Sequence, residues 1–141
     1  MHVTDTPPVS LYAGGMIVLA TVMVTLAAAL HIAIFFMESV TWTRPAVWRR
    51  FGLTDQAAAE TTRPLAYNQG FYNLFLAIGA IVGLILYRVG TPGAGLALIL
   101  FTMGSMLAAA VVLVTSGSGH LRSALIQGTL PLIGIVLMLL S

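Results

Sequence analysis

Four apolar stretches, each long enough to cross a bilayer, constrain this chain more than any other feature. They lie at about residues 11–37, 65–87, 94–115 and 121–140, and about 20 apolar residues suffice for a helix across the ~30 Å hydrocarbon core. A soluble domain rarely combines 59% hydrophobic residues with only 7% charged ones. The sequence therefore predicts an all-α integral membrane protein that forms one membrane domain over residues 1–141.

The connections between these stretches predict how the helices are joined. Residues 89–93 and 116–119 are short and rich in glycine, as tight turns between neighbouring helices are. Residues 38–64 form a longer connection that mixes aromatic and cationic residues, as a segment lying at the membrane interface does. We expect an antiparallel up-down bundle of four transmembrane helices with one longer amphipathic cytoplasmic loop. The alternative is an ordinary solvated loop whose tryptophans pack on the bundle.

Two residues in that loop suggest a short helix of its own. Thr54 is of a type that caps helix N-termini, and Pro64 is of a type that ends helices. We therefore expect a short helix between them, followed by the second span near residue 65.

Charge predicts the orientation and limits the partners. Five of the six arginines lie in the first and third connections, and the second connection holds only Arg88. By the positive-inside rule, the first and third connections face the cytoplasm and both termini lie outside. Six scattered arginines without lysine are too few for a nucleic-acid surface, so nucleic acid is not an expected partner. The absence of cysteine excludes disulfides, thiolate-bound metal and thiol catalysis.

Polar side chains inside the predicted spans gather toward the cytoplasmic end. A polar side chain in hydrocarbon needs a partner, a cavity or a function. Chain connectivity puts the end of the first span and the starts of the second and fourth at the same membrane face. The candidate ligand-binding residues there are Asn68, Gln69, Tyr72, Asn73 and Gln127, with Trp42 in the loop at headgroup level. Their alternative role is to join the helices by hydrogen bonds.

His31 and Glu38 are the candidate catalytic residues. They lie seven positions apart, so an ideal helix presents them on one face, two turns apart. Such a pair could transfer protons, because histidine titrates near neutral pH. The alternatives are a histidine that only packs and a Glu38 carboxylate that is solvated or paired with Arg44 or Arg63. A metal site is not expected, because the spans hold no third His, Asp or Glu, and His120 lies in a tight connection.

Small residues in the second and third spans predict close helix packing. Gly79 and Gly83, and Gly104 and Ala108, have the spacing that lets membrane helices approach each other. Packing within the chain is the first interpretation of these pairs, and self-association is the second.

Several of these motifs resemble a known family. The string Asn-Gln-Gly-x-Tyr-Asn is the most specific of them, and the others occur in the same order along the chain. The segments that carry the resemblance are His31–Glu38, Trp42–Pro45, Phe51–Leu53, Asn68–Ala77 and Gln127–Gly128. From about residue 25 to 137 the chain resembles the small bacterial membrane proteins catalogued as domain of unknown function 1304. The resemblance implies four spans, in a bacterial inner membrane, and no established activity.

Two functions of different classes fit this sequence. The first is a small bundle that binds a lipophilic or amphipathic molecule in a polar pocket near the cytoplasmic face, where His31 or Glu38 could transfer protons. The second is a structural or accessory subunit, in a homo-oligomer or a larger complex, whose polar cluster only fixes helix packing. Membrane lipid is an expected partner of either, and no cofactor is expected. A proton-linked transporter has less support, because the sequence shows no inverted repeat.

Overall fold

The computed structural model of the protein describes residues 9–141, and it describes the side chains from Gly14 onward except that of Ser118. Within this range the structure is helical and contains no strand. The elements in chain order are α1 (Val9–Phe35), η1 (Phe36–Val40), α2 (Pro45–Trp48), η2 (Arg49–Phe51), α3 (Gln56–Val89), α4 (Pro92–Thr115), η3 (Ser118–His120) and α5 (Leu121–Leu140). Four helices are long and apolar enough to span a membrane. The chain is a multi-pass membrane protein, as its sequence predicts.

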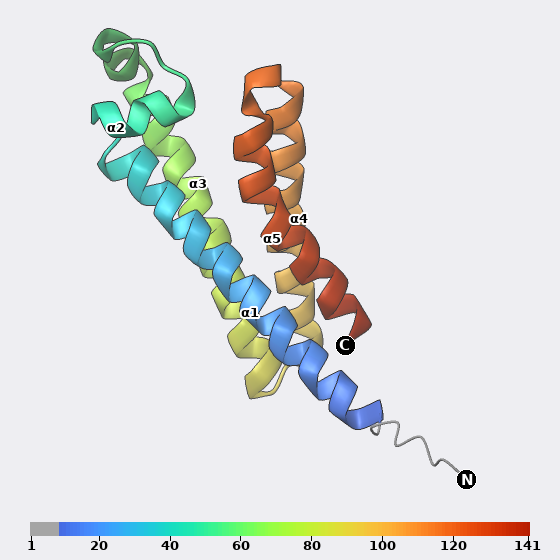
Figure 1. The fold of residues 1–141 in the computed structure, drawn as a ribbon. Helices are drawn as coiled ribbons and strands as arrows, with labels where there is room; N and C mark the ends of the chain where they lie inside the picture. Colours follow the sequence, from blue (N-terminus) through green and yellow to red (C-terminus); the bar gives the residue numbers. More distant parts are fainter. Residues whose placement is uncertain (1–8) are drawn as a thin grey trace.

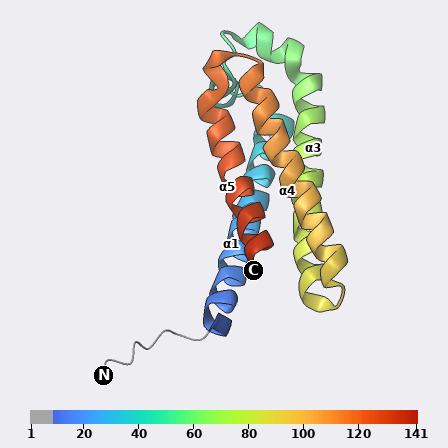
Figure 2. The ribbon, with the colours of Figure 1, turned by 90° about the vertical axis from the view of Figure 1, so that its right-hand side faces the viewer.

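The four long helices form two pairs. Helix α1 packs against α3 and α5, and α4 packs against the same two helices. The connection from η1 to α3 and the connection from α4 to α5 lie at one end of the molecule, which we call the loop end (Figure 1). The connection from α3 to α4 lies at the other end, which we call the turn end, and a second view agrees (Figure 2). The α1–α3 pair and the α4–α5 pair diverge toward the loop end.

A core of small and flexible side chains joins the helices away from the loop end. Alanines supply half of it, which lets the backbones approach, and methionines fill the remaining space. The buried cluster is Ala20, Val24, Ala27, Ala28, Ala77, Ala80, Ile99, Met103, Met106 and Met138.

Glycines set the spacing between α3 and α4. A Cβ added at Gly79 would lie 2.6 Å from the methyl group of Thr102, and one added at Gly83 would lie 2.8 Å from the Ile99 side chain. The close packing expected at these two glycines is therefore confirmed. The same expectation was wrong for Gly104, which has no atom within 4 Å of such a Cβ. The reason is that Gly104 does not lie on the face of α4 that meets the neighbouring helices, whereas Gly95 does.

The start of α3 differs from the short helix that the sequence predicts between Thr54 and Pro64. Asp55, rather than Thr54, caps the helix, and its carboxylate accepts a hydrogen bond of 2.8 Å from the Ala58 backbone N–H. That bond lowers the pKa of Asp55. The helix then continues through Pro64, so the connection expected at residues 38–64 shrinks to 41–55. Pro64 removes one helix bond, to the carbonyl of Glu60, and both residues are exposed, where water can reach the freed group.

Replacing Gly95 by Ala tests the close approach of α3 and α4. The new Cβ would overlap the backbone of Tyr87, which cannot move without shifting the end of α3. We expect Gly95→Ala to destabilise the protein by roughly 1–3 kcal/mol, as overpacking does. Thermal unfolding followed by circular dichroism in detergent micelles measures the change. Gly93→Ala is the matched control, because Gly93 lies in the same helix with open space around it. Equal stability of the two variants would contradict this packing.

Candidate functional site

A cavity of about 510 Å³ lies between the two helix pairs at the loop end. Small-molecule sites in proteins commonly measure roughly 300–1,000 Å³. All four long helices and both connections contribute to its wall. The polar lining residues are Glu38, Arg50, Gln69, Tyr72, Asn73, His120, Ser123 and Gln127, and the apolar ones are Leu30, Ile34, Met37, Phe51, Leu76, Ala109, Leu113 and Ile126.

The lining changes from polar to apolar with depth. Along α1 and η1, Glu38 lies nearest the loop end, and Ile34 and Leu30 lie successively deeper. Along α3, Gln69 comes first and Leu76 lies about two turns deeper. From Leu30 to Glu38 the helix advances by eight steps, which corresponds to about 12 Å of rise. The cavity therefore has a polar mouth and an apolar floor.

The π-helical segment η1 positions Glu38 at the mouth. The Thr41 backbone N–H donates to the Phe36 carbonyl five residues back, over 3.0 Å, which defines the wider turn. The Ser39 hydroxyl donates to the Tyr67 carbonyl over 2.9 Å and fixes the segment against α3. Glu38 then accepts a hydrogen bond of 2.9 Å from Asn73. This contact replaces the pairing with Arg44 or Arg63 that the sequence left open.

His31 does not line the cavity, although an ideal helix would place it on the same face as Glu38. It is fully buried, and its Nδ1 lies 2.9 Å from the Ala27 carbonyl oxygen. Because that oxygen only accepts, the proton is assigned to Nδ1. Its Nε2 has no hydrogen-bond partner among the described residues. The structure therefore brings Glu38, and not His31, to the cavity.

The other sequence candidates divide into lining and supporting residues. Gln69, Tyr72, Asn73 and Gln127 line the cavity together, as their shared depth predicts. Asn68 is exposed and lies outside the lining.

Trp42 holds the connection in place and does not face the cavity. It is buried, and its indole N–H donates to the Ala59 carbonyl over 3.0 Å. Its ring packs on Phe51 with a centroid distance of 5.0 Å. A second indole bond, from Trp48 to the Gln56 side chain at 3.1 Å, fixes the other half of the connection. The connection therefore folds back on the start of α3 and brings Phe51 and Arg50 into the wall of the cavity.

Three polar lining residues were not among the sequence candidates for ligand binding. Arg50 was used only as a signal of orientation, His120 was considered only as a metal ligand, and Ser123 was not considered. The sequence feature that could have identified them is their position, because all three lie in or beside the two connections at the loop end. No group of three His, Asp or Glu side chains that could hold a metal ion occurs in the part of the chain that the structure describes.

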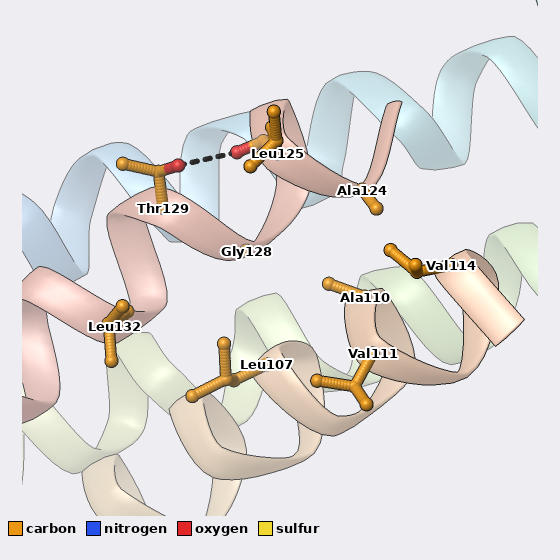
Figure 3. A pocket seen from close by; sticks show the side chains of 9 residues that line it. All are labelled: Leu107, Ala110, Val111, Val114, Ala124, Leu125, Gly128, Thr129 and Leu132. Atoms are coloured by element: carbon orange, nitrogen blue, oxygen red, sulfur yellow. Dashed lines mark hydrogen bonds between the residues drawn. The ribbon is translucent and has the colours of Figure 1, made fainter. Parts of the chain in front are cut away.

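A second, apolar groove lies between α4 and α5 and measures about 180 Å³ (Figure 3). The one polar side chain in its wall is Thr129, and that hydroxyl already donates to the Leu125 carbonyl over 2.6 Å. Gly128 lets the helices approach here, because a Cβ at this position would lie 2.9 Å from that of Ala110. This groove has no free polar group to orient a ligand, so the cavity at the loop end is the candidate site.

Comparison with known proteins gives one match. A family model described as a protein of unknown function, DUF1304, matches residues 25–139. The matched range includes every residue that lines the cavity. It confirms the resemblance carried by the Asn-Gln-Gly-x-Tyr-Asn string. No curated protein and no solved structure matches the chain.

Replacing Gly70 by Ala tests how η1 is held. An added Cβ would overlap the Ser39 hydroxyl and push η1 away from α3. We expect Gly70→Ala to cost roughly 1–3 kcal/mol of stability and to increase hydrogen exchange in residues 36–41, measured by mass spectrometry. Adding Ser39→Ala should recover part of the loss, because it removes the nearest overlapping atom. Gly104→Ala, which meets no neighbour, should change neither measurement.

Proposed function

We propose that this chain, which belongs to the DUF1304 family of proteins of unknown function, binds a lipophilic or amphipathic molecule in the cavity at its loop end. The observation that carries the proposal is the combination of a polar mouth and an apolar floor in one cavity. A bound molecule would place its polar head among the side chains of the mouth. Its apolar part would then lie against residues such as Leu30 and Ile34.

The polar groups of the cavity wall support binding because several are not used within the protein. Gln69, Tyr72 and Gln127 line the cavity, and their side chains make no hydrogen bond to another described residue. Polar groups at membrane depth are costly unless they are paired or face water or a ligand. A bound head group would satisfy them.

Proton transfer is a further step that this site would allow. Glu38 is the carboxylate that lines the cavity, so its side chain can exchange a proton with a bound molecule. His31 does not line the cavity, so Glu38 is the stronger candidate of the two.

The second candidate function is that of a structural or accessory subunit. The hydrogen bonds from Asn73 to Glu38 and from Ser39 to Tyr67 favour it, because both join η1 to α3. They account for three polar side chains at this end, Glu38, Ser39 and Asn73, and leave the unpaired side chains of Gln69, Tyr72 and Gln127 unexplained. Binding in the cavity is consistent with the two hydrogen bonds and also gives the three unpaired side chains a role.

For the orientation, we propose four antiparallel spans in the bacterial inner membrane with both termini outside. The cavity then opens toward the cytoplasmic leaflet, and the connection 41–55 lies at the interface. The distribution of positive charge supports this orientation, because cytoplasmic connections carry an excess of arginine and lysine. Near the turn end lies Arg88, and near the loop end lie Arg44, Arg49, Arg50, Arg63 and Arg122.

Filling the cavity tests the binding function. Ala109 lines the floor, and a tryptophan there would occupy much of the apolar space. We expect Ala109→Trp to lower the binding of a monoacylglycerol by at least about tenfold, measured by native mass spectrometry of the full chain released from detergent. The matched control is Ala108→Trp, because Ala108 is the exposed neighbour and lines neither cavity nor groove. Equal binding by both variants would refute binding in this cavity.

Cysteine labelling tests the orientation. The chain has no cysteine, so a single introduced thiol reports on one position. Thr54 and Thr91 are both exposed, in the first connection and in the connection from α3 to α4 respectively. In intact bacterial cells we expect a membrane-impermeant maleimide to label Thr91→Cys, and to label Thr54→Cys only after the membrane is opened. The reverse pattern would overturn the proposed orientation.

A further inference from the structure

Two opposite charges line the cavity without neutralising each other. Arg50 enters the wall from η2, and Glu38 enters it from η1. The two side chains form no ion pair with each other, and the hydrogen-bond partner of Glu38 is Asn73. Each charge is therefore available to an opposite charge on a bound molecule.

Local structure holds the two charges apart. The bonds of Ser39 and Asn73 fix η1, and with it Glu38, against α3. The indole bond of Trp42 to Ala59 fixes the connection that carries Arg50. The fold therefore holds the two backbone segments that carry these charges, and a ligand meets both segments already in place.

The surroundings of Glu38 suit an ammonium group. Asn73 uses its Nδ2 twice, to donate to Glu38 and to the Gln69 carbonyl at 3.1 Å, so its side-chain oxygen remains free to accept. A carboxylate has about four acceptor sites, and Asn73 occupies one of them. Gln69 and Gln127 add further amide oxygens to the same wall. A primary ammonium has three donors and one positive charge, which match these acceptors. Carboxylates within membrane spans are generally paired in this way.

The surroundings of Arg50 suit a phosphate. A guanidinium group binds phosphate through two parallel hydrogen bonds, and arginine is favoured wherever phosphate is recognised. His120, in the connection between α4 and α5, and Ser123, in the first turn of α5, line the cavity and add donors from another side. Arg50 and His120 both lie at the loop end.

We propose that the head group received by the cavity is a zwitterion in which a phosphate is joined to a primary ammonium, with the phosphate at Arg50 and the ammonium at Glu38. This inference rests on the proposed binding function and names its ligand class. A head group with no net charge complements one arginine and one carboxylate better than a purely anionic or an uncharged one does. The apolar floor would hold a hydrocarbon chain attached to this head group.

Three single-chain probes that carry the same acyl chain test the inference. They are monoacylglycerol without charge, lysophosphatidic acid with phosphate alone, and lysophosphatidylethanolamine with phosphate and ammonium. Native mass spectrometry of the full chain gives their relative affinities. We expect lysophosphatidylethanolamine to bind about tenfold more tightly than the other two probes. Equal affinity for the two phosphate-bearing probes would overturn the inference.

Two charge-removing variants assign the contacts. Glu38→Gln should weaken lysophosphatidylethanolamine about tenfold without weakening lysophosphatidic acid, because only the first carries an ammonium. Arg50→Gln should weaken both phosphate-bearing probes about tenfold more than it weakens monoacylglycerol. Arg122→Gln is the matched control, because Arg122 is an exposed arginine near the same end that does not line the cavity. Thermal unfolding of each variant verifies that it folds. Insensitivity of lysophosphatidylethanolamine to Glu38→Gln would also overturn the inference.

The outcomes separate this inference from the proposed function. If monoacylglycerol binds but the phosphate-bearing probes bind no better, the cavity binds amphipaths and the zwitterion is wrong. If none of the three probes binds, the binding function itself is wrong. Soluble phosphoethanolamine could also compete with lysophosphatidylethanolamine for the cavity. If it does, and if Glu38→Gln and Arg50→Gln each abolish this competition, the head-group chemistry is supported and the ligand is a water-soluble molecule. Absence of such competition beside tight binding of lysophosphatidylethanolamine would support a lipid source.

Discussion

The close approach of α3 and α4 near the turn end is the contact on which the remaining architecture depends. At Gly83 and Gly95 the two backbones are so near that a methyl group on either glycine would meet the other helix. Helices that touch this closely at one end and cross at an angle must separate toward the other end. The two pairs of helices do diverge there (Figure 1), and the cavity lies in the region of divergence. The site is therefore a consequence of the packing at the opposite end.

A wide gap between helices becomes a specific site only when its wall is fixed. At the loop end this is achieved by hydrogen bonds to backbone carbonyls rather than by a large core. Ser39 donates to Tyr67 and Trp42 donates to Ala59, and both acceptors lie in the part of α3 nearest the loop end. A neutral hydrogen bond contributes only about 0.5–1.5 kcal/mol net. The direction of each hydrogen bond matters more here than its energy, because the direction determines which side chains of η1 and η2 face the cavity.

The sequence was sufficient to predict the number of long helices and the end of the bundle at which to look for a site. Gln69, Tyr72 and Gln127 share the cavity because chain connectivity places them toward the same end of the bundle. Direction around a helix was harder to predict. The spacing of His31 and Glu38 predicted a shared face, yet only Glu38 lines the cavity, while His31 is buried in the helix packing. Gly104 had the right spacing for close contact and lies on a face that meets no neighbour. Arg50 joins the cavity through bonds made by residues elsewhere in the connection, which a local pattern does not reveal.

His31 marks the boundary between the packed half of the molecule and the half that holds the cavity. A Cβ at Gly134 would lie 3.6 Å from Val24, so these positions of α5 and α1 are level. Because α1 runs toward the loop end and α5 runs away from it (Figure 1), seven residues further toward that end bring His31 level with Gln127. At this depth the His31 side chain is fully buried with a free Nε2, and the Gln127 side chain lines the cavity. A buried polar atom without a partner costs about 1–3 kcal/mol. The fold bears that cost in the layer where helix packing gives way to the cavity.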